Sequence, residues 1–145
     1  MALYLVQHGL ALPKSSDPGK GLSEQGKAQT KQIAEVAAHY GIGVRRILHS
    51  GKRRAEETAV IFDRYLQPPE GNYLGEGLGP LDDVSILAGE LDLSNDWMLI
   101  SHLPLLSRLT TFLIIGKLEP ALFLFQNSGI VCIDLDAKES RAGIK

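Results

Sequence analysis

The sequence predicts a three-layer α/β/α domain with a mostly parallel central sheet and one antiparallel edge strand. Short apolar runs alternate with longer amphipathic stretches along most of the 145 residues, which is the pattern of strand–helix units on a parallel sheet. Near the C-terminus two apolar runs are separated only by residues 126–128, a spacing that fits a hairpin and would supply the antiparallel edge. The length suits one domain, so we expect residues 1–145 to form it, with a polar tail from about residue 137.

Caps and turn residues indicate where the individual elements lie. Ser23 is suited to begin a helix that ends at Gly41, and Ser50 to begin a second helix that ends before Pro68. Shorter helices are expected at 83–91 and 104–115. The apolar runs predict strands at 3–6, 44–48, 73–74, 97–100, 121–125 and 129–135, and the Pro-, Ser- and Gly-rich residues 10–21 predict a loop.

Composition excludes several classes of function. The formal net charge of −2 lacks the basic excess of a nucleic-acid binder. Cys132 is the one cysteine, which excludes an internal disulfide and a cysteine-built zinc site, and the four histidines include no i,i+4 pair. No apolar run is long enough to span a membrane, and residues 1–13 lack the features of a signal peptide. We therefore expect a cytoplasmic protein with no metal or other cofactor, no nucleic-acid partner and no membrane partner.

Polar residues follow three of the predicted strands. His8 and Gly9 follow the first strand, Ser50 follows the second, and His102 follows a later one. In α/β sheets, ligands bind beyond the carboxyl ends of the strands. If these strands are neighbours, then His8, Arg54 and His102 converge on one site. Gly9 would let the backbone bend there or a ligand approach closely.

The helix predicted after Ser50 carries Arg53 and Arg54 in its first turn. The helix dipole disfavours positive side chains there, and a bound anion would relieve that cost, although we expect at least one arginine to be solvated. The stretch SGKRRA is not a nucleotide-binding P-loop, because Arg46 stands where that motif needs glycine and Arg53 where it needs serine or threonine. Histidines and arginines without a metal fit phosphoryl transfer through a phosphohistidine, since neutral imidazole is nucleophilic near pH 7.

These residues resemble the motifs of the histidine phosphatase superfamily, which includes the phosphoglycerate mutases. LYLVQHGLA at residues 3–11 resembles its opening strand and catalytic loop, which is normally Arg-His-Gly. HSGKRRAEETA resembles its second motif, with Arg54 as the motif arginine, and ISHLPLL resembles the motif of the second histidine. The short length, the Ser-His-Leu-Pro form and the strings KGLSEQG and LGPLDDV resemble the SixA-type phosphohistidine phosphatase branch.

The resemblance implies a phosphoglycerate mutase-like fold and a phosphatase that forms a phosphohistidine intermediate. It implies that His8 is the nucleophile, that Arg54 binds the phosphoryl oxygens, and that His102 stabilises the transition state. The expected substrate is phosphohistidine on a signalling protein, possible examples being histidine phosphotransfer domains. Beside Arg54, the residues expected to bind phosphate are Gln7, Gly9, Ser50 and Lys20.

Gln7 stands where the superfamily has an arginine, and it leaves three hypotheses open. Glutamine offers two N–H donors but no charge, and the loss of one transition-state donor costs about 10²–10³ in rate. The first hypothesis is an active, metal-independent phosphatase whose activity Gln7 reduces. The second is a phosphate-binding pseudo-phosphatase with weak or no turnover, and the third is a phosphatase for small phosphomonoesters or other small phosphorylated molecules. A mutase is not expected, because the chain has no room for the insertions that enclose a mutase substrate.

Overall fold

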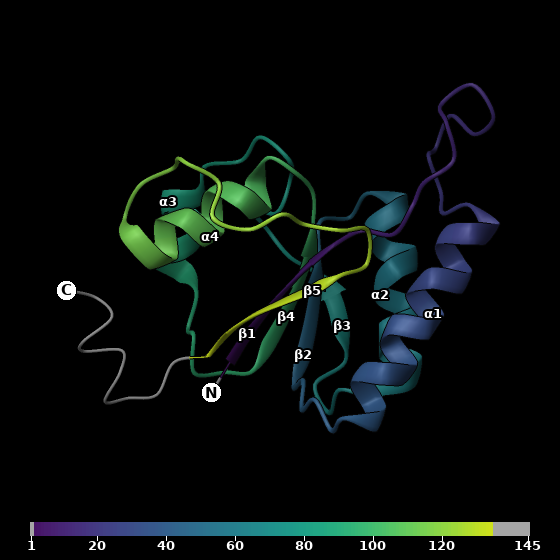
Figure 1. The fold of residues 1–145 in the computed structure, drawn as a ribbon, viewed down its shortest axis with the longest axis horizontal. Helices are drawn as coiled ribbons and strands as arrows, with labels where there is room; N and C mark the ends of the chain where they lie inside the picture. Colours follow the sequence, from purple (N-terminus) through teal and green to yellow (C-terminus); the bar gives the residue numbers. More distant parts are fainter. Residues whose placement is uncertain (1, 135–145) are drawn as a thin grey trace.

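The computed structural model describes residues 2–134, which form one sheet with helices on both faces (Figure 1). Within these residues no helix is long and apolar enough to cross a membrane. The polar tail predicted from about residue 137 lies outside the described residues. The strands are β1 (Ala2–Gln7), β2 (Arg46–His49), β3 (Asn72–Leu74), β4 (Trp97–Ser101) and β5 (Ile130–Asp134). The helices are α1 (Glu24–His39), α2 (Arg53–Leu66), α3 (Val84–Glu90) and α4 (Leu105–Ile115).

The sheet is mostly parallel, and β4 lies at its centre. The strand order is β3-β2-β4-β1-β5, and β4 pairs in parallel with both β1 and β2. β2 also pairs in parallel with β3, whereas β5 pairs antiparallel with β1. The predicted α/β class, the parallel sheet and the antiparallel edge strand are therefore confirmed.

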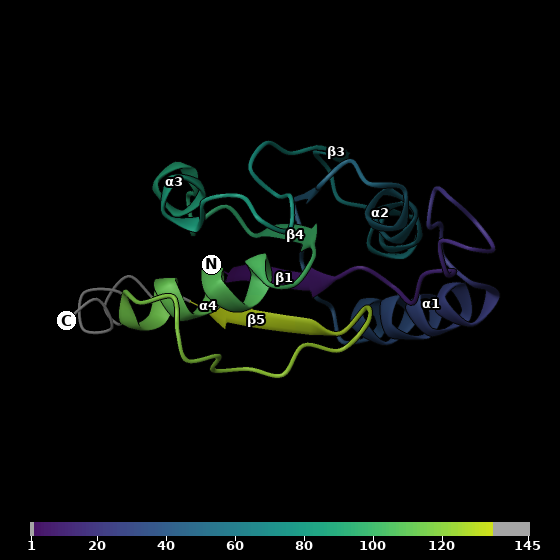
Figure 2. The same cartoon turned by 90° about the horizontal axis from the view of Figure 1, so that it is seen from above.

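Side chains of the strands alternate between two cores, as expected for a sheet that is covered on both faces. Leu3 and Leu5 of β1 belong to a core that includes Leu106 of α4. Val6 of the same strand belongs to a second core that includes Phe62 of α2. In Figure 2, α3 and α4 lie to one side of the strands and α1 and α2 to the other, which is the predicted three-layer arrangement.

The predicted N-cap of the first helix is confirmed, and two further helix ends have caps of the usual kind. Ser23 caps α1, because its hydroxyl oxygen accepts a hydrogen bond from the Gly26 N–H at 2.9 Å. Asp83 caps α3 in the same way, accepting from the Ser85 N–H at 2.8 Å. Gly116 ends α4 in the left-handed conformation that glycine adopts without steric cost. The four helices accordingly lie close to the predicted ranges.

One predicted strand is wrong. Residues 121–125 form no strand, so the expected hairpin with the last strand does not exist. Asn127 instead forms a bridge with Gln7, and the Ser128 N–H donates to the Gln7 carbonyl oxygen at 2.8 Å. These contacts hold the chain at the carboxyl end of β1 just before β5 begins. In Figure 2 the segment between α4 and β5 lies outside the edge of the sheet, and no residue of 121–125 pairs with β5.

Replacing Phe62 by alanine tests how closely the core beneath α2 is packed. The Phe62 side chain is fully buried, so we expect the free energy of unfolding to fall by about 3–5 kcal/mol. Val60 lies on the same helix and is 48% exposed, so Val60→Ala should change that free energy by less than about 0.5 kcal/mol. Urea unfolding measures both variants, and equal losses would contradict this packing.

Candidate active site

The parallel pairing of three strands brings the predicted site residues to one edge of the sheet. In the register of β1 with β4, Gln7 lies beside Ser101, and in that of β2 with β4, His49 lies beside Ile100. The residues that follow these strands therefore leave the sheet at the same level. They are His8 after β1, Ser50 after β2 and His102 after β4.

The side chains of His8, Arg54 and His102 meet at this edge. The ring centroids of His8 and His102 are 4.9 Å apart. Arg54, in the first turn of α2, places its Nε 3.4 Å from His8 Nε2. Ser50 Oγ lies 2.6 Å from His102 Nε2. The structure thus brings together the three residues predicted as catalytic, with Ser50 beside them.

The hydrogen bond of His8 identifies which ring nitrogen carries its lone pair. His8 Nδ1 lies 2.7 Å from the carbonyl oxygen of Gly9. A carbonyl oxygen can only accept, so Nδ1 carries the proton and donates it. In the neutral imidazole the lone pair is then on Nε2, the nitrogen that faces Arg54. Nε2 is therefore the ring nitrogen whose lone pair is available to an electrophile.

Gly9 is required for packing at this position. A Cβ atom on Gly9 would lie 2.7 Å from Thr30 Oγ1 and 3.0 Å from Ser128 Oγ. We had expected this glycine to leave room for a ligand. In the structure, the space that a Gly9 side chain would occupy is already filled by Thr30 and Ser128. Its N–H donates to Thr58 Oγ1 at 2.9 Å, and the Thr58 hydroxyl donates to the Arg54 carbonyl oxygen at 2.7 Å. Phosphate binding by Gly9 stays a prediction.

Gln7 and Lys20, the other predicted phosphate ligands, lie at the border of the site. Gln7 ends β1 and is half-buried, and within residues 2–134 its side-chain amide makes no hydrogen bond. Lys20 is exposed on the loop before α1, and its charge contributes to lowering the pKa of His8. Both side chains therefore have donors to offer to an anion, and their role as ligands stays a prediction.

The start of α2 differs from the prediction in a way that serves the site. Ser50 was expected to cap this helix, but the helix begins at Arg53 and its N-cap residue, Lys52, makes no side-chain capping bond. The Ser50 hydroxyl is turned to His102 instead. Arg53 is the solvated arginine, since its side chain is 58% exposed, and it forms an ion pair with Asp17 at 3.3 Å. It holds the loop before α1 against α2 and lies outside the cluster.

Burial and positive charge keep both imidazoles uncharged. Burial lowers the pKa of His8, and the charges of Arg54 and Lys20 lower it further, against the opposing effect of its bond to Gly9. Burial, His8, Arg54 and Lys52 together lower the pKa of His102 to about 3. The site therefore combines neutral imidazoles with cationic side chains, an environment suited to an anion such as a phosphoryl group.

Three supporting residues were not assigned a role from the sequence. Thr58 is in register with the second motif, and the structure shows that it ties Gly9 to α2. Asn127 Nδ2 donates to the His8 carbonyl oxygen at 3.1 Å, and Ser128 packs under Gly9. The spacing of residues 126–128 had indicated only a turn, so no local signal could have identified Asn127 or Ser128.

Nearby carboxylates are engaged in local structure. Asp82 accepts a hydrogen bond from the Gly79 N–H at 2.7 Å, and Asp83 caps α3. Within residues 2–134 no group of three or more His, Cys, Asp or Glu side chains could hold a metal ion.

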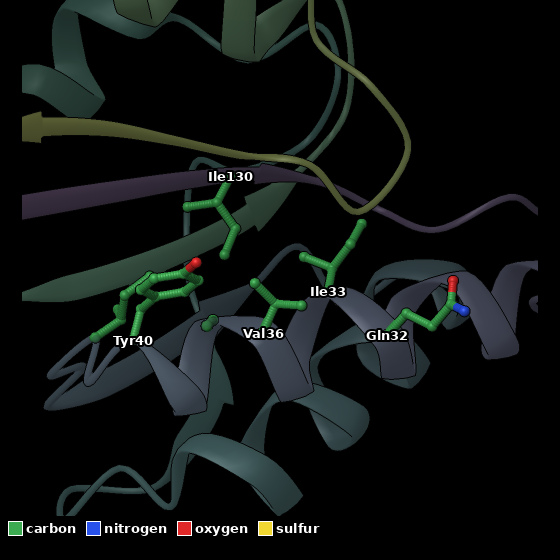
Figure 3. Close-up of a pocket in the computed structure, with 7 residues that line it drawn as sticks. Gln32, Ile33, Val36, Tyr40 and Ile130 are labelled. Atoms are coloured by element: carbon green, nitrogen blue, oxygen red, sulfur yellow. The ribbon is translucent and has the colours of Figure 1, made fainter.

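A separate hollow lies between α1 and β5 (Figure 3). It has a volume of about 410 Å³ and is lined mainly by apolar side chains, with none of the predicted site residues among them. Val36 and Tyr40 border it from α1 and its C-terminal cap, and Ile130 borders it from β5. It offers a phosphoryl group no cationic side chain, so the cluster around His8 remains the candidate active site.

Comparison with known proteins places this geometry among the phosphatases. The chain is 29% identical over 142 residues to the phosphohistidine phosphatase SixA of Escherichia coli (strain K12), covering 94% of this chain and 86% of that protein. The structure of the protein histidine phosphatase SixA complexed with tungstate matches with a TM-score of 0.80 and 27% identity, over 95% of this chain and 90% of that chain. The alpha-ribazole phosphatase from Shigella flexneri shares the fold, with a TM-score of 0.66 and 17% identity over 95% and 92% of the chains.

No family model matches the chain. The resemblance to the histidine phosphatase superfamily and to its SixA branch is nevertheless confirmed by similarity of sequence and fold over nearly the whole chain.

The uncharged state of His102 predicts how stability changes with pH. In the folded chain its pKa is about 3, against an ordinary value of 6.5. As the pH falls from 6.5 toward 3, the unfolded chain takes up a proton at His102 that the folded chain does not, so the free energy of unfolding decreases. We expect His102→Asn to make this decrease shallower in urea unfolding between about pH 7 and pH 4.

His39→Asn is the matched control, since His39 is an exposed histidine at the end of α1. This variant should keep the wild-type slope. If His102→Asn has an unchanged or steeper slope, then His102 does not stay uncharged in the folded chain.

Proposed function

We propose that this chain, similar in sequence and fold to the SixA-type histidine phosphatases, hydrolyses phosphohistidine on a signalling protein through a phosphorylated His8. The observation that carries the proposal is the lone pair on His8 Nε2, which faces the Arg54 guanidinium. In the first step Nε2 attacks phosphorus, and the bond from phosphorus to the substrate nitrogen breaks. In the second step water attacks phosphorus, which releases inorganic phosphate and restores the neutral imidazole.

Arg54 is suited to bind the oxygens of the transferring group. In the free site its Nε–H donates to His8 Nε2 over a long 3.4 Å. Within the described residues its Nη groups donate to no protein acceptor, so the guanidinium retains donors for an anion. A phosphoryl group at Nε2 would replace the weak contact with hydrogen bonds to its oxygens, whose charge the arginine stabilises.

His102 is suited to donate a hydrogen bond to the same group. Its Nδ1 is buried without a hydrogen-bond partner, whereas its Nε2 lies 2.6 Å from Ser50 Oγ. If the ring proton is on Nε2, that N–H donates to Ser50 Oγ, and only a lone pair on Nδ1 is left without a partner. In the proposed mechanism this N–H and the Ser50 hydroxyl turn to phosphoryl oxygens, where the developing charge strengthens both bonds.

Lysines partly replace the positive charge that Gln7 does not supply. Lys20 and Lys52 both lower the pKa of a site histidine, which places their charges within electrostatic reach of the two rings. Gln7 itself provides N–H donors at the end of β1. We propose that the phosphoryl group is held by one fixed cation, Arg54, by these two mobile ones, and by neutral donors.

Exposed apolar side chains beside the site support a protein substrate. Leu74 packs against Gly51, which follows Ser50, and is 66% exposed. Leu103 follows His102 and is 43% exposed. A small phosphomonoester would leave these side chains in water, whereas a docked protein would bury them. A histidine phosphotransfer domain is the partner that we propose.

Comparing two substrates in the wild type and three variants tests this function. We expect the wild type to hydrolyse a phosphorylated histidine phosphotransfer domain faster than an aryl phosphate, and His8→Ala to lose both activities. Arg54→Ala should lower kcat by about 10²–10³-fold, because it removes a charged transition-state donor. Gln7→Arg should raise the rate on both substrates.

The same measurements decide between the alternative functions. Phosphate binding that needs Arg54, with turnover appearing only in Gln7→Arg, would show a pseudo-phosphatase. Faster hydrolysis of the aryl phosphate would indicate a phosphatase for small phosphomonoesters. Activity that survives His8→Ala would rule out the proposed intermediate.

The lowered pKa of His8 predicts the acid limb of the pH profile. The nucleophile must be neutral, so kcat/KM falls as His8 becomes protonated, and the midpoint of that fall should lie below the ordinary histidine value of 6.5. Lys20→Gln removes a charge that lowers this pKa, so the midpoint should move to higher pH.

Lys14→Gln is the control, because Lys14 is exposed on the same loop and is not among the charges that act most strongly on His8. Rates on an aryl phosphate across the pH range measure all three proteins. If the fall of kcat/KM at low pH has the same midpoint in Lys20→Gln as in the wild type, then the charge of Lys20 does not act on His8.

A further inference from the structure

The peptide unit that joins His8 to Gly9 is held at both of its polar groups. The His8 carbonyl oxygen accepts a hydrogen bond from Asn127 Nδ2 at 3.1 Å. The Gly9 N–H, at the other end of the unit, donates to Thr58 Oγ1 at 2.9 Å. Because a peptide unit is planar, two bonds at its opposite ends fix the rotation of the whole plane. Asn127 and Thr58 therefore act on the backbone of the nucleophile.

The orientation of this plane bears on the tautomer of His8. The Gly9 carbonyl oxygen, which accepts the His8 Nδ1–H at 2.7 Å, belongs to the next peptide unit along the chain. Rotation of the His8–Gly9 unit would move that oxygen relative to the ring. Without this acceptor the imidazole could place its proton on Nε2, and Nε2 would then have no lone pair with which to attack phosphorus.

Asn127 is itself held in place by its neighbour. Ser128 is fully buried in the left-handed conformation, with φ of 61°. Its N–H donates to the Gln7 carbonyl oxygen at 2.8 Å, and its Oγ lies 2.5 Å from Thr30 Oγ1 of α1. These bonds anchor the turn before β5 to both β1 and α1. The Asn127 amide is thereby fixed over the carboxyl end of β1.

We propose that Asn127 is a positioning residue for His8, which it holds in the Nδ1–H tautomer by fixing the His8–Gly9 peptide plane. The proposal rests on the function of His8 proposed above. Asn127 acts through the backbone and through Gly9, so its effect falls on the chemical step rather than on substrate binding. It also gives a function to the turn that connects the active site to the antiparallel edge strand.

Nitrogen-15 NMR of the imidazole rings tests the proposal without requiring turnover. In the wild type, the His8 signals, assigned by their absence in His8→Ala, should show a protonated Nδ1 and an unprotonated Nε2. Asn127→Ala removes the donor and should give a mixture of the two tautomers. Asn127→Asp keeps the shape but cannot donate, so it should shift the tautomer in the same direction if the alanine variant is too unstable to measure.

Kinetics on an aryl phosphate provide the second measurement. We expect kcat of Asn127→Ala to fall about 10- to 100-fold with KM unchanged, as for a misplaced reacting group. Gln126→Ala is the matched control, since Gln126 is exposed in the same turn and its side chain makes no hydrogen bond within residues 2–134. It should keep the wild-type tautomer and kcat.

Two outcomes would overturn the proposal. One is an unchanged tautomer in both Asn127 variants, whatever their kcat, because Asn127 would then not act through the His8 ring. The other is a wild type in which His8 is protonated on Nε2. Absence of turnover in the wild type would instead contradict the proposed function, and the tautomer measurement would still decide the role of Asn127.

Discussion

The arrangement of the candidate active site depends on one constraint: β4 lies between β1 and β2 and is parallel to both. Because β1 and β2 both pair with β4 in the same direction, the three carboxyl ends meet at one edge of the sheet. The His8 N–H donates to the Ser101 carbonyl oxygen at 3.0 Å, so the β1–β4 ladder extends one residue beyond the strand. His8 is thus fixed by the sheet on its N-terminal side and by Asn127, Thr58 and Gly9 on the other. The groups that hold His8 and Gly9 thus come from β4, from α2 and from the turn before β5.

The site differs from the rest of the interior in the hydrogen-bonding capacity that it leaves unused. Most buried polar groups elsewhere are paired within the fold, as in the bond between Thr30 and Ser128, although Arg46 Nε has no partner within residues 2–134. In the site, by contrast, the Arg54 guanidinium makes one long bond to a ring nitrogen, and its other N–H groups donate to no acceptor within the described residues. Unpaired polar groups in a partly buried place are costly. An anion bound there would recover that cost, which is the physical reason why a phosphoryl group suits this site.

Local signals predicted the elements, and long-range contacts decided where the predictions failed. Apolar runs and caps such as Ser23 located the strands and helices because their physical causes lie within a few residues. Histidines after two strands, with Arg54 at a helix start, identified the cluster because parallel strands must end together. Ser50 was mispredicted as a helix cap because its hydroxyl bonds to the distant His102. The hairpin with residues 121–125 was mispredicted because Asn127 and Ser128, just before β5, bond to Gln7 at the end of β1. No pattern in the neighbourhood of Asn127 could reveal a bond to a residue 119 positions away.

Gln7 links the geometry of the site to the choice of substrate. A fixed arginine at the end of β1 would bring permanent charge to the phosphoryl group, whereas Lys20 lies on an exposed loop and would lose side-chain entropy on binding such a group. In the function proposed above, phosphoryl transfer would therefore proceed with less preorganised charge than an arginine would give. A phosphomonoester with a poor leaving group depends strongly on such charge, but the P–N bond of a phosphohistidine is labile and depends on it less. The substitution that weakens a general phosphatase is thus most tolerable for the substrate proposed here, and the exposed apolar side chains around the site provide the contacts through which a protein could compensate in binding.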